Sequence, residues 1–520
     1  MKVLIFFSLM ILVDVCTTNT PLDPDYQELP DLKEITISEV QKYYRDGIYT
    51  VEEVTLYYLD RIQQLDDQGP HLNAVLETNP EALQIARSLD QKLKAGQPLG
   101  RLFGVPVILK DNIDTRDKMS TTAGSRAMEG SKPLQDSYIV ERLRAEDAII
   151  LGKANLSEWA NFRGRLSSSG WSGLGGQTRN PYDTTRNPCG SSSGSAVAVS
   201  ANLCLVAIGT ETNGSIVCPS TANGIVGLKP TVGLWSRSGI IPISKTQDTP
   251  GPMTRSVADA AITLGACTGL DERDPYTEDG YENAVEDYSQ FLNKDGLQGK
   301  RIGLFKGTYG EHYKVDTLLD RAVEDMKALG AEFVEIENIA MSNAWPASLE
   351  VMLYEYKDGL NKYFKSLGPN APITSIEELI AFNKSDSIEL RHYDQYYLKE
   401  AIKKGDLSDT AYQKALKEMH RIMRKEGIDR IMDEHKLDAI VGATGSPAWK
   451  TDLINGDHYM LSTSSPAAMA GYPNLTVPMG YIDGLPVGIS FFGRAWSEGT
   501  LIELAYAYEQ ETAHRKAPGL

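Results

Sequence analysis

The sequence predicts an α/β fold in which a mostly parallel or mixed sheet lies within one large domain. Between residues 102 and 259, short apolar runs alternate with helical stretches and with clusters of Gly, Ser and Pro. This alternation is typical of buried strands joined by helices. The chain shows no internal repeat, low-complexity tract or convincing linker. Residues 35–515 are therefore expected to form a single domain, although 520 residues could fill several domains of average size.

The expected strands are short apolar segments bounded by turn-forming residues. They are residues 105–109, 148–151, 203–208, 224–228, 299–305, 437–441 and 485–492. Helices are expected at residues 81–95, 136–146, 194–202, 315–329, 408–435 and 497–512. Two more helices are predicted near the N-terminus, where Ser38 with Gln41 and Thr50 with Glu53 fit capping boxes.

The charge balance weighs against nucleic-acid binding. The formal net charge is −18 and the isoelectric point is near 5.0, whereas contact with a phosphate backbone needs clustered Lys and Arg. Apolar residues make up 41% of the chain and charged residues 23%, which is ordinary for a globular protein.

The N-terminus resembles a secretory signal peptide, assigned to residues 1–18. Lys2 precedes an apolar run over residues 3–13, which Asp14 interrupts. The run is too short to span a bilayer, which takes about 20 residues; the alternative is a buried N-terminal strand or helix. The signal predicts a secreted or periplasmic protein, and no later segment has the pattern of a membrane span.

Four cysteines follow this segment: Cys189, Cys204, Cys218 and Cys267. Four in about 500 residues do not make a disulfide scaffold. They form no CxxC pair and have no neighbouring histidine, so zinc is not supported. Each is predicted to be a small core residue, and we expect neither a metal nor another cofactor.

Two Gly/Ser-rich segments flank an apolar strand, at residues 189–195 and 209–217. Small residues at this density let backbone amides approach a ligand closely, and such amides can stabilise an oxyanion. The alternative is a flexible loop, but flexible linkers are rarely attached to apolar strands on both sides.

Residues 190–194 also fit G-x-S-x-G, the nucleophile elbow of α/β-hydrolases. That motif needs a strand directly before it and a catalytic histidine later in the chain. Here the preceding residues 185–188 are turn-like, and His458 is the best of seven histidines in an unconvincing context. A Ser-His-Asp triad is therefore disfavoured.

Lys110 is a better candidate base. It ends the predicted strand 105–109 and precedes Asp111 and Asn112. A lysine at a strand end can project into a cleft, where burial favours the neutral amine that accepts a proton. An isolated lysine is far more often a solvated surface charge, so this assignment depends on the surrounding motifs.

Those motifs resemble the amidase signature family over nearly the whole chain after about residue 35. The segments that carry the resemblance are residues 104–112, 227–231, 470–478 and 484–488. Within the family the chain most resembles bacterial peptide amidases, through residues 155–164, 175–181 and 247–253. The resemblance implies one domain with a twisted mixed β-sheet core surrounded by helices.

The resemblance also implies a Ser–cis-Ser–Lys catalytic set. Lys110 matches the family's base, and Ser191 matches the serine whose peptide bond is cis. Ser215 matches the nucleophile. The family's oxyanion hole corresponds here to backbone amides of Thr212 to Ser215, chiefly those of Asn213 and Gly214.

The expected activity is therefore hydrolysis of carbon–nitrogen amide bonds through an acyl-enzyme, with C-terminal peptide amides as candidate substrates. Three alternatives stay open: an amidase for fatty or other small amides, an amidotransferase component that passes ammonia to a partner, and a silent binding protein on the same fold. The N-terminal signal argues against the second, and retention of Lys110, Ser191 and Ser215 argues against the third.

Several positions depart from the commonest family pattern. Cys189 and Ser193 replace glycines, Val217 replaces an arginine, and Asn213 stands where relatives have Gly or Asp. If the loop needs a left-handed residue at position 213, Asn is among the tolerated residues. Two further sets of residues complete the predictions. Gln247, Asp248 and residues 159–163 are expected on the substrate side or in structural roles. Sequons begin at Asn155, Asn213, Asn383 and Asn474, of which Asn383 is the most plausible glycan acceptor.

Overall fold

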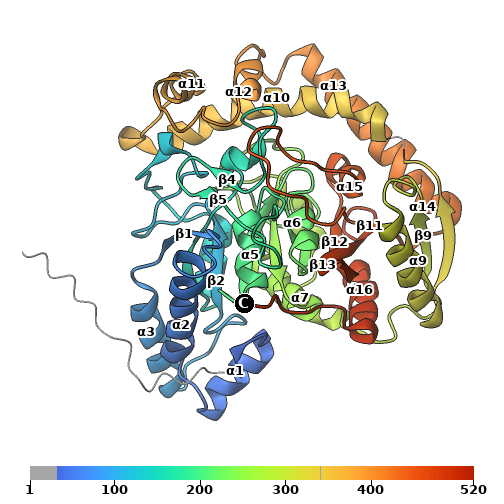
Figure 1. Ribbon diagram of the computed structural model, residues 1–520, viewed down its shortest axis with the longest axis horizontal. Coiled ribbons are helices and arrows are strands. Elements are labelled where there is room, and N and C mark those ends of the chain that lie inside the picture. Colours follow the sequence, from blue (N-terminus) through green and yellow to red (C-terminus); the bar gives the residue numbers. More distant parts are fainter. Residues whose placement is uncertain (1–31, 340) are drawn as a thin grey trace, which may run out of the picture.

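The computed structural model describes residues 32–339 and 341–520, and the predicted signal peptide at residues 1–18 lies outside this range. Its centre is a mixed sheet of 11 strands in the order β1-β3-β2-β6-β8-β7-β12-β13-β11-β9-β10, surrounded by helices (Figure 1). β2 runs parallel to both β3 and β6, whereas β8 is antiparallel to β6 and β7. The predicted single α/β domain with a mixed sheet core is confirmed.

The strands of this sheet are β1 (Val75–Thr78), β2 (Pro106–Lys110), β3 (Ile149–Ala154), β6 (Val206–Glu211), β7 (Val226–Lys229), β8 (Thr249–Thr254), β9 (Arg301–Phe305), β10 (Glu332–Ile336), β11 (Ala439–Ala443), β12 (Asn474–Ile482) and β13 (Leu485–Phe492). β4 (Trp171–Ser172) and β5 (Gly176–Gln177) form a separate two-stranded sheet. Each of the seven predicted strands overlaps an observed one. β8 was not predicted, because Pro250 and Pro252 lie within it and proline cannot donate to a ladder.

The helices are α1 (Ile37–Asp46), α2 (Val51–Arg61), α3 (Ala82–Lys94), α4 (Tyr138–Ala145), α5 (Ser193–Ser200), α6 (Val217–Ala222), α7 (Val257–Cys267), α8 (Thr277–Asn283), α9 (Tyr313–Ala328), α10 (Met341–Ser366), α11 (Ile376–Ser385), α12 (Tyr396–Ala401), α13 (Thr410–His420), α14 (Asp429–His435), α15 (Ser464–Ala470) and α16 (Glu498–Thr512). The capping box of α2 at Thr50 and Glu53 is confirmed. The box of α1 is formed by Thr36 and Glu39 rather than by Ser38 and Gln41, so that prediction was two residues late.

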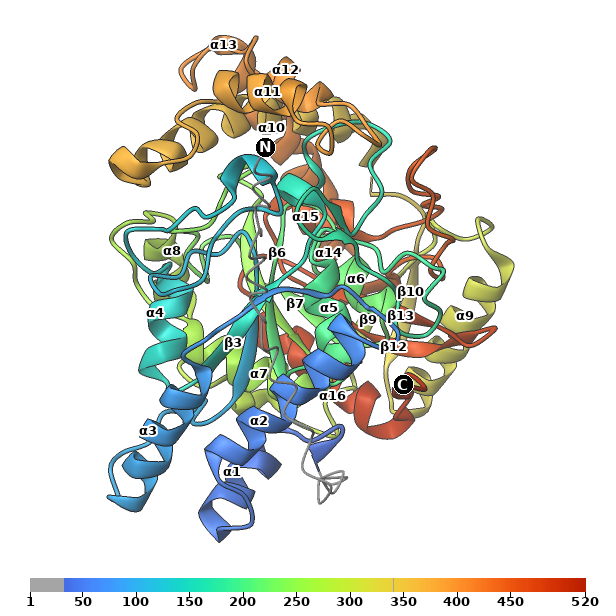
Figure 2. The same ribbon diagram turned by 60° about the vertical axis from the view of Figure 1, so that its left-hand side comes forward.

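Helices α10 to α13 form a layer of their own at one end of the sheet, in both Figure 1 and Figure 2. They bury an apolar cluster that includes Met352, Tyr356 and Phe364 of α10. The 26-residue helix α10 was not predicted. Among the described residues, no helix combines the length and the apolar character needed to cross a membrane.

Two sequence predictions are corrected by side-chain positions. Cys189 and Cys218 form a disulfide with a Cα–Cα distance of 5.9 Å, whereas Cys204 and Cys267 are buried free thiols as expected. Spacing along the chain cannot reveal that residues 189 and 218 are adjacent in the fold, so the disulfide was missed.

The predicted glycan acceptor, Asn383, is fully buried and donates to Gln395 Oε1 at 3.2 Å. A glycan cannot reach that position in the folded protein, so the predicted acceptor was wrong.

Candidate active site

Lys110 is the last residue of β2, and its side chain is completely buried. Its Nζ donates to Ser191 Oγ at 2.7 Å, to Thr210 Oγ1 at 2.9 Å and to the Thr210 carbonyl at 3.1 Å. Burial lowers the pKa of Lys110 to about 7, against the opposing effect of the negative charges of Asp248 and Glu211. Near pH 7, Lys110 is therefore a neutral amine in about half of the molecules, and a neutral amine is the form that can accept a proton.

Ser191 is also completely buried, and the Gly190–Ser191 peptide bond is cis. The loop around it is fixed on both sides. The Ser191 carbonyl accepts from Ser157 N at 3.1 Å. Ahead of it, Asn187 Oδ1 accepts from Cys189 N at 2.8 Å. The Ser191 hydroxyl is thus held against Lys110 with little freedom to move.

Ser215 lies in the loop between β6 and α6, and its side chain borders a cavity. Its carbonyl accepts from Ser192 N at 3.2 Å, which holds the two serine loops next to each other. Glu211 Oε2 accepts from Ile216 N at 2.8 Å and from Val217 N at 3.1 Å, which anchors the far side of the loop. The structure therefore gathers Lys110, Ser191 and Ser215 at one place, from segments about 80 and 105 residues apart in sequence.

The residues of the loop before Ser215, from Thr212 to Gly214, line the same cavity as Ser215. Within residues 32–339 and 341–520, the N–H groups of Asn213, Gly214 and Ser215 donate no hydrogen bond to the protein. The Asn213 side chain binds Ser464 and Ser465, since Ser464 Oγ donates to its Oδ1 at 2.8 Å. Free amides of this kind can stabilise an oxyanion.

The left-handed residue of this loop is Gly214, with a φ of 84°, and not Asn213. The condition considered for position 213 therefore does not apply, because the left-handed conformation falls on the following glycine. A Cβ at position 214 would lie 3.1 Å from Ser464 Oγ, so both the backbone conformation and the limited space favour glycine there.

The cavity that reaches Ser215 has a volume of about 380 Å³. Helix α10 contributes Trp345, Leu349 and Met352 to its lining. Phe162 and Tyr397 form another part of the wall, with rings stacked at a centroid distance of 4.4 Å. Most of this lining is apolar, which suits a substrate with an apolar body and one reactive polar end.

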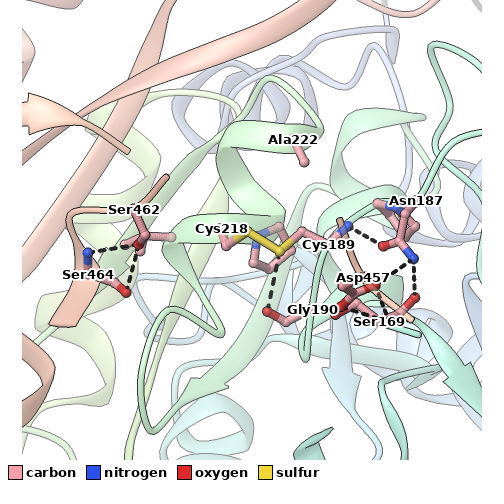
Figure 3. The surroundings of a disulfide bond; sticks show 12 residues. Ser169, Asn187, Cys189, Gly190, Cys218, Ala222, Asp457, Ser462 and Ser464 are labelled. Atoms are coloured by element: carbon pink, nitrogen blue, oxygen red, sulfur yellow. Dashed lines mark hydrogen bonds between the residues drawn. A yellow bond between two sulfur atoms is a disulfide. The ribbon is translucent and has the colours of Figure 1, made fainter. Parts of the chain in front are cut away.

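The disulfide between Cys189 and Cys218 also lines the cavity and joins the Ser191 loop to helix α6, which directly follows the Ser215 loop (Figure 3). Asp457, on the loop between β11 and α15, fixes the same region. Its carboxylate accepts from Ser169 Oγ at 2.5 Å, from Trp449 Nε1 at 3.2 Å and from Asn187 Nδ2 at 3.3 Å. The wall beside the cis peptide is thus crosslinked covalently and by hydrogen bonds.

The residues expected on the substrate side divide between two locations. Ala160, Asn161 and Phe162 line the cavity. Arg163 is absent from that lining and is buried between Glu158, at 3.3 Å, and Glu389, at 3.0 Å. Gln247 and Asp248 lie behind the loop of residues 212–215, outside the cavity lining.

The structure does not place His458, the alternative base, at the catalytic serines. His458 is exposed and lies 3.2 Å from Asp452 Oδ2, whereas the group in contact with Ser191 is Lys110. Thr210 and the Ser464–Ser465 pair were not singled out from the sequence. Thr210 lies within the segment 209–217, and the serine pair lies a few residues before the motif at 470–478; only these motifs could have indicated the three residues. Among the described residues, no group of three or more His, Cys, Asp or Glu side chains could hold a metal ion.

Comparison with known proteins agrees with this arrangement. The sequence matches the family described as Amidase over residues 53–502. A probable amidase of Arabidopsis thaliana is 41% identical over 503 residues, covering 94% of this chain and 92% of that protein. A putative amidase of Schizosaccharomyces pombe is 35% identical over 545 residues, covering 98% of this chain and 91% of that protein.

Among solved structures, the native peptide amidase of Stenotrophomonas maltophilia superposes with a TM-score of 0.90 at 49% identity, covering 94% of this chain and 98% of that one. The peptide amidase PAM bound to the competitive inhibitor chymostatin gives a TM-score of 0.92 at 49% identity, covering 94% and 99%. The chain therefore belongs to the amidase family and is an amide-bond hydrolase.

Proposed function

We propose that this enzyme hydrolyses the C-terminal amide of peptides, with Ser215 as nucleophile, Ser191 as proton relay and Lys110 as base. The observation that carries the proposal is the buried Lys110–Ser191 contact of 2.7 Å, next to a cavity that contains Ser215 and unpaired loop amides. The substrate assignment rests on the apolar cavity and on the 49% identity to peptide amidases.

In the proposed reaction, neutral Lys110 takes the proton of Ser191, and Ser191 takes the proton of Ser215. Ser215 Oγ then attacks the amide carbonyl, and the loop amides of residues 213–215 hold the oxyanion. The proton returns through Ser191 to the leaving nitrogen, because an amine leaves readily only when protonated. Ammonia departs, and water cleaves the acyl-enzyme to a free carboxylate by the same proton path.

The size and chemistry of the cavity support a peptide rather than a very small amide. A volume of about 380 Å³ falls in the range of sites that take drug-sized ligands. Trp345, which is 46% exposed, stands where the cavity wall meets the surface. An aromatic side chain in that position can pack against the residue that precedes the amidated one.

We also propose that the enzyme works outside the cytoplasm. The predicted N-terminal signal is one reason, and the Cys189–Cys218 disulfide at the active site is an independent one. Disulfides persist in oxidising compartments and are rare in the cytosol. Fractionation of cells that express the full chain tests this; protein retained in the cytosol with an unprocessed N-terminus contradicts it.

The test of substrate class is ammonia release from a matched panel. Each peptide amide is compared with its free acid, with a fatty amide and with an aryl amide, using the purified chain without any partner protein. Rapid release from peptide amides supports the proposal. Turnover confined to fatty or aryl amides overturns it, and so does activity that needs a co-purifying partner protein, which would indicate an amidotransferase.

A further inference from the structure

We infer that Asp248 is a positioning residue for the reaction, which holds the oxyanion loop through Thr212 and places a negative charge near Lys110. Asp248 does not reach the cavity that contains Ser215. Its effect is exerted through two other residues. The inference rests on the proposed roles of Lys110 and of the loop amides.

The Asp248 carboxylate has a defined set of donors. Its Oδ1 accepts from Thr212 Oγ1 at 2.5 Å, and its Oδ2 accepts from the amides of Ile243 and Ser244, both at 2.8 Å. The two amides fix the carboxylate, and the carboxylate in turn fixes Thr212. Thr212 directly precedes the free amides of residues 213–215, so its position sets where those amides point.

Gln247, which precedes Asp248 in the chain, contacts the backbone carbonyl of Thr212. Gln247 Nε2 lies 3.5 Å from the Thr212 carbonyl, a long hydrogen bond, and Gln247 Oε1 accepts from Ser348 Oγ of α10 at 2.9 Å. The neighbouring residue of that helix, Leu349, lines the substrate cavity. The turn at residues 243–248 therefore connects the substrate wall with the start of the oxyanion loop.

Asp248 is also close to the proposed base. Asn112, Thr210, Thr212 and Asp248 border a common small cavity of about 10 Å³, and Thr210 binds Lys110 Nζ. The negative charge of Asp248 opposes the effect of burial on Lys110 and keeps its pKa near 7 instead of lower. A base with a pKa near the working pH is the most effective one.

The charged groups around this pair come from several elements. Glu211, at the end of β6, is the other carboxylate that favours the Lys110 ammonium. Burial raises the pKa of Asp248 to about 6, against the hydrogen bonds from Thr212, Ser244 and Ile243 and the positive charge of Arg237, whose guanidinium is paired with Asp274. Asp248 is thus ionised at neutral pH, where we expect the enzyme to work.

The test is the variant Asp248→Asn, which keeps the side-chain size and removes the charge. Loss of the carboxylate lowers the pKa of Lys110, so the acidic limb of the kcat/KM profile should move to lower pH by about one unit. The plateau kcat should fall by about tenfold or more, with KM changed by less than about threefold, because the oxyanion loop loses its anchor.

Two variants separate the charge from the anchor. Thr212→Val removes the anchored hydroxyl and should lower kcat. Because that hydroxyl also lowers the pKa of Asp248, this comparison is made at pH 8, where the carboxylate stays ionised without it. Asp248→Glu keeps the charge but shifts the carboxylate, so kcat should fall without the one-unit movement of the acidic limb; this variant also tests the anchor if Asp248→Asn does not fold. Asp259→Asn is the matched control, because Asp259 is a buried carboxylate in the first turn of α7 and lies outside the lining of the cavity.

The inference is overturned if Asp248→Asn folds and keeps both the wild-type acidic limb and the wild-type kcat. A fall in kcat equal to that of Asp259→Asn, with an unmoved acidic limb, would show a merely structural role and overturn it as well. The proposed function fails separately, when the wild-type protein releases no ammonia from any peptide amide.

Discussion

Replacing Lys110 by methionine separates the chemistry of this side chain from its packing. Methionine has a similar length and fills the buried space, but it cannot accept the proton of Ser191. General-base catalysis contributes about 10²- to 10⁴-fold to a rate. We therefore expect Lys110→Met to lower kcat/KM for a peptide amide at pH 7.5 by at least that factor.

The same variant should be more stable than the wild type. Lys110 has a pKa of about 7 in the folded protein, against an ordinary value of 10.5. Between these pH values the unfolded chain binds the extra proton, so this lysine costs stability that is regained as the pH rises from about 7 to 10.5. At pH 7 the burial of Lys110 lowers the free energy of unfolding by at most about 5 kcal/mol. The gain in stability on replacement by methionine is smaller than this, because methionine loses the hydrogen bonds to Ser191 and Thr210.

The assays are ammonia release across pH 5 to 9 and thermal unfolding at pH 7. In the wild type, kcat/KM should fall as the pH drops below about 7, because the ammonium form of Lys110 cannot act as a base. An inactive Lys110→Met variant with a raised unfolding midpoint agrees with the reasoning. A variant that keeps most of its activity at neutral pH refutes the proton relay, and one that is inactive but also less stable refutes the argument from burial.

Three further predictions concern the two serine loops. Ser215→Ala should retain the fold and release no ammonia within the limit of detection; residual turnover that remains after repurification would exclude Ser215 as nucleophile. The Cys189→Ser/Cys218→Ser double variant should lose about 3.5 kcal/mol of unfolding free energy, because the bridge joins residues separated by 29 positions. An unchanged midpoint of urea unfolding would contradict this. Gly214→Ala should lower kcat by at least about tenfold with little change in KM, and unaltered steady-state kinetics would show that the left-handed backbone at this position is not needed.

Much of the site could be predicted from the sequence because it depends on local patterns. Lys110 ends an apolar strand, and strand ends place side chains at the edge of a sheet. The Gly/Ser segments around Ser191 and Ser215 flank a second apolar strand, β6, which pairs directly with β2. That adjacency brings the three residues together, but the sequence did not predict it, because β3 lies between β2 and β6 in the chain and on the other side of β2 in the sheet.

The missed features depend on contacts between distant segments. The disulfide joins residues 189 and 218, and nothing in their spacing distinguishes them from the other two cysteines. Helix α10 supplies part of the cavity wall, yet it contains Pro346, which is unusual inside a helix, and no helical pattern was identified there. Gln247 and Asp248 were noticed as a motif, but only the fold shows that they lie behind Thr212 rather than against substrate.

The measurement that tests the central claim most directly is active-site labelling with a fluorophosphonate probe, followed by proteolysis and mass spectrometry of the labelled peptide. The account predicts a single adduct on Ser215, formed at a rate that falls with pH as Lys110 becomes protonated, and absent from Ser215→Ala. An adduct on Ser191 or on another residue would contradict it, and so would the absence of labelling in a preparation that releases ammonia from peptide amides.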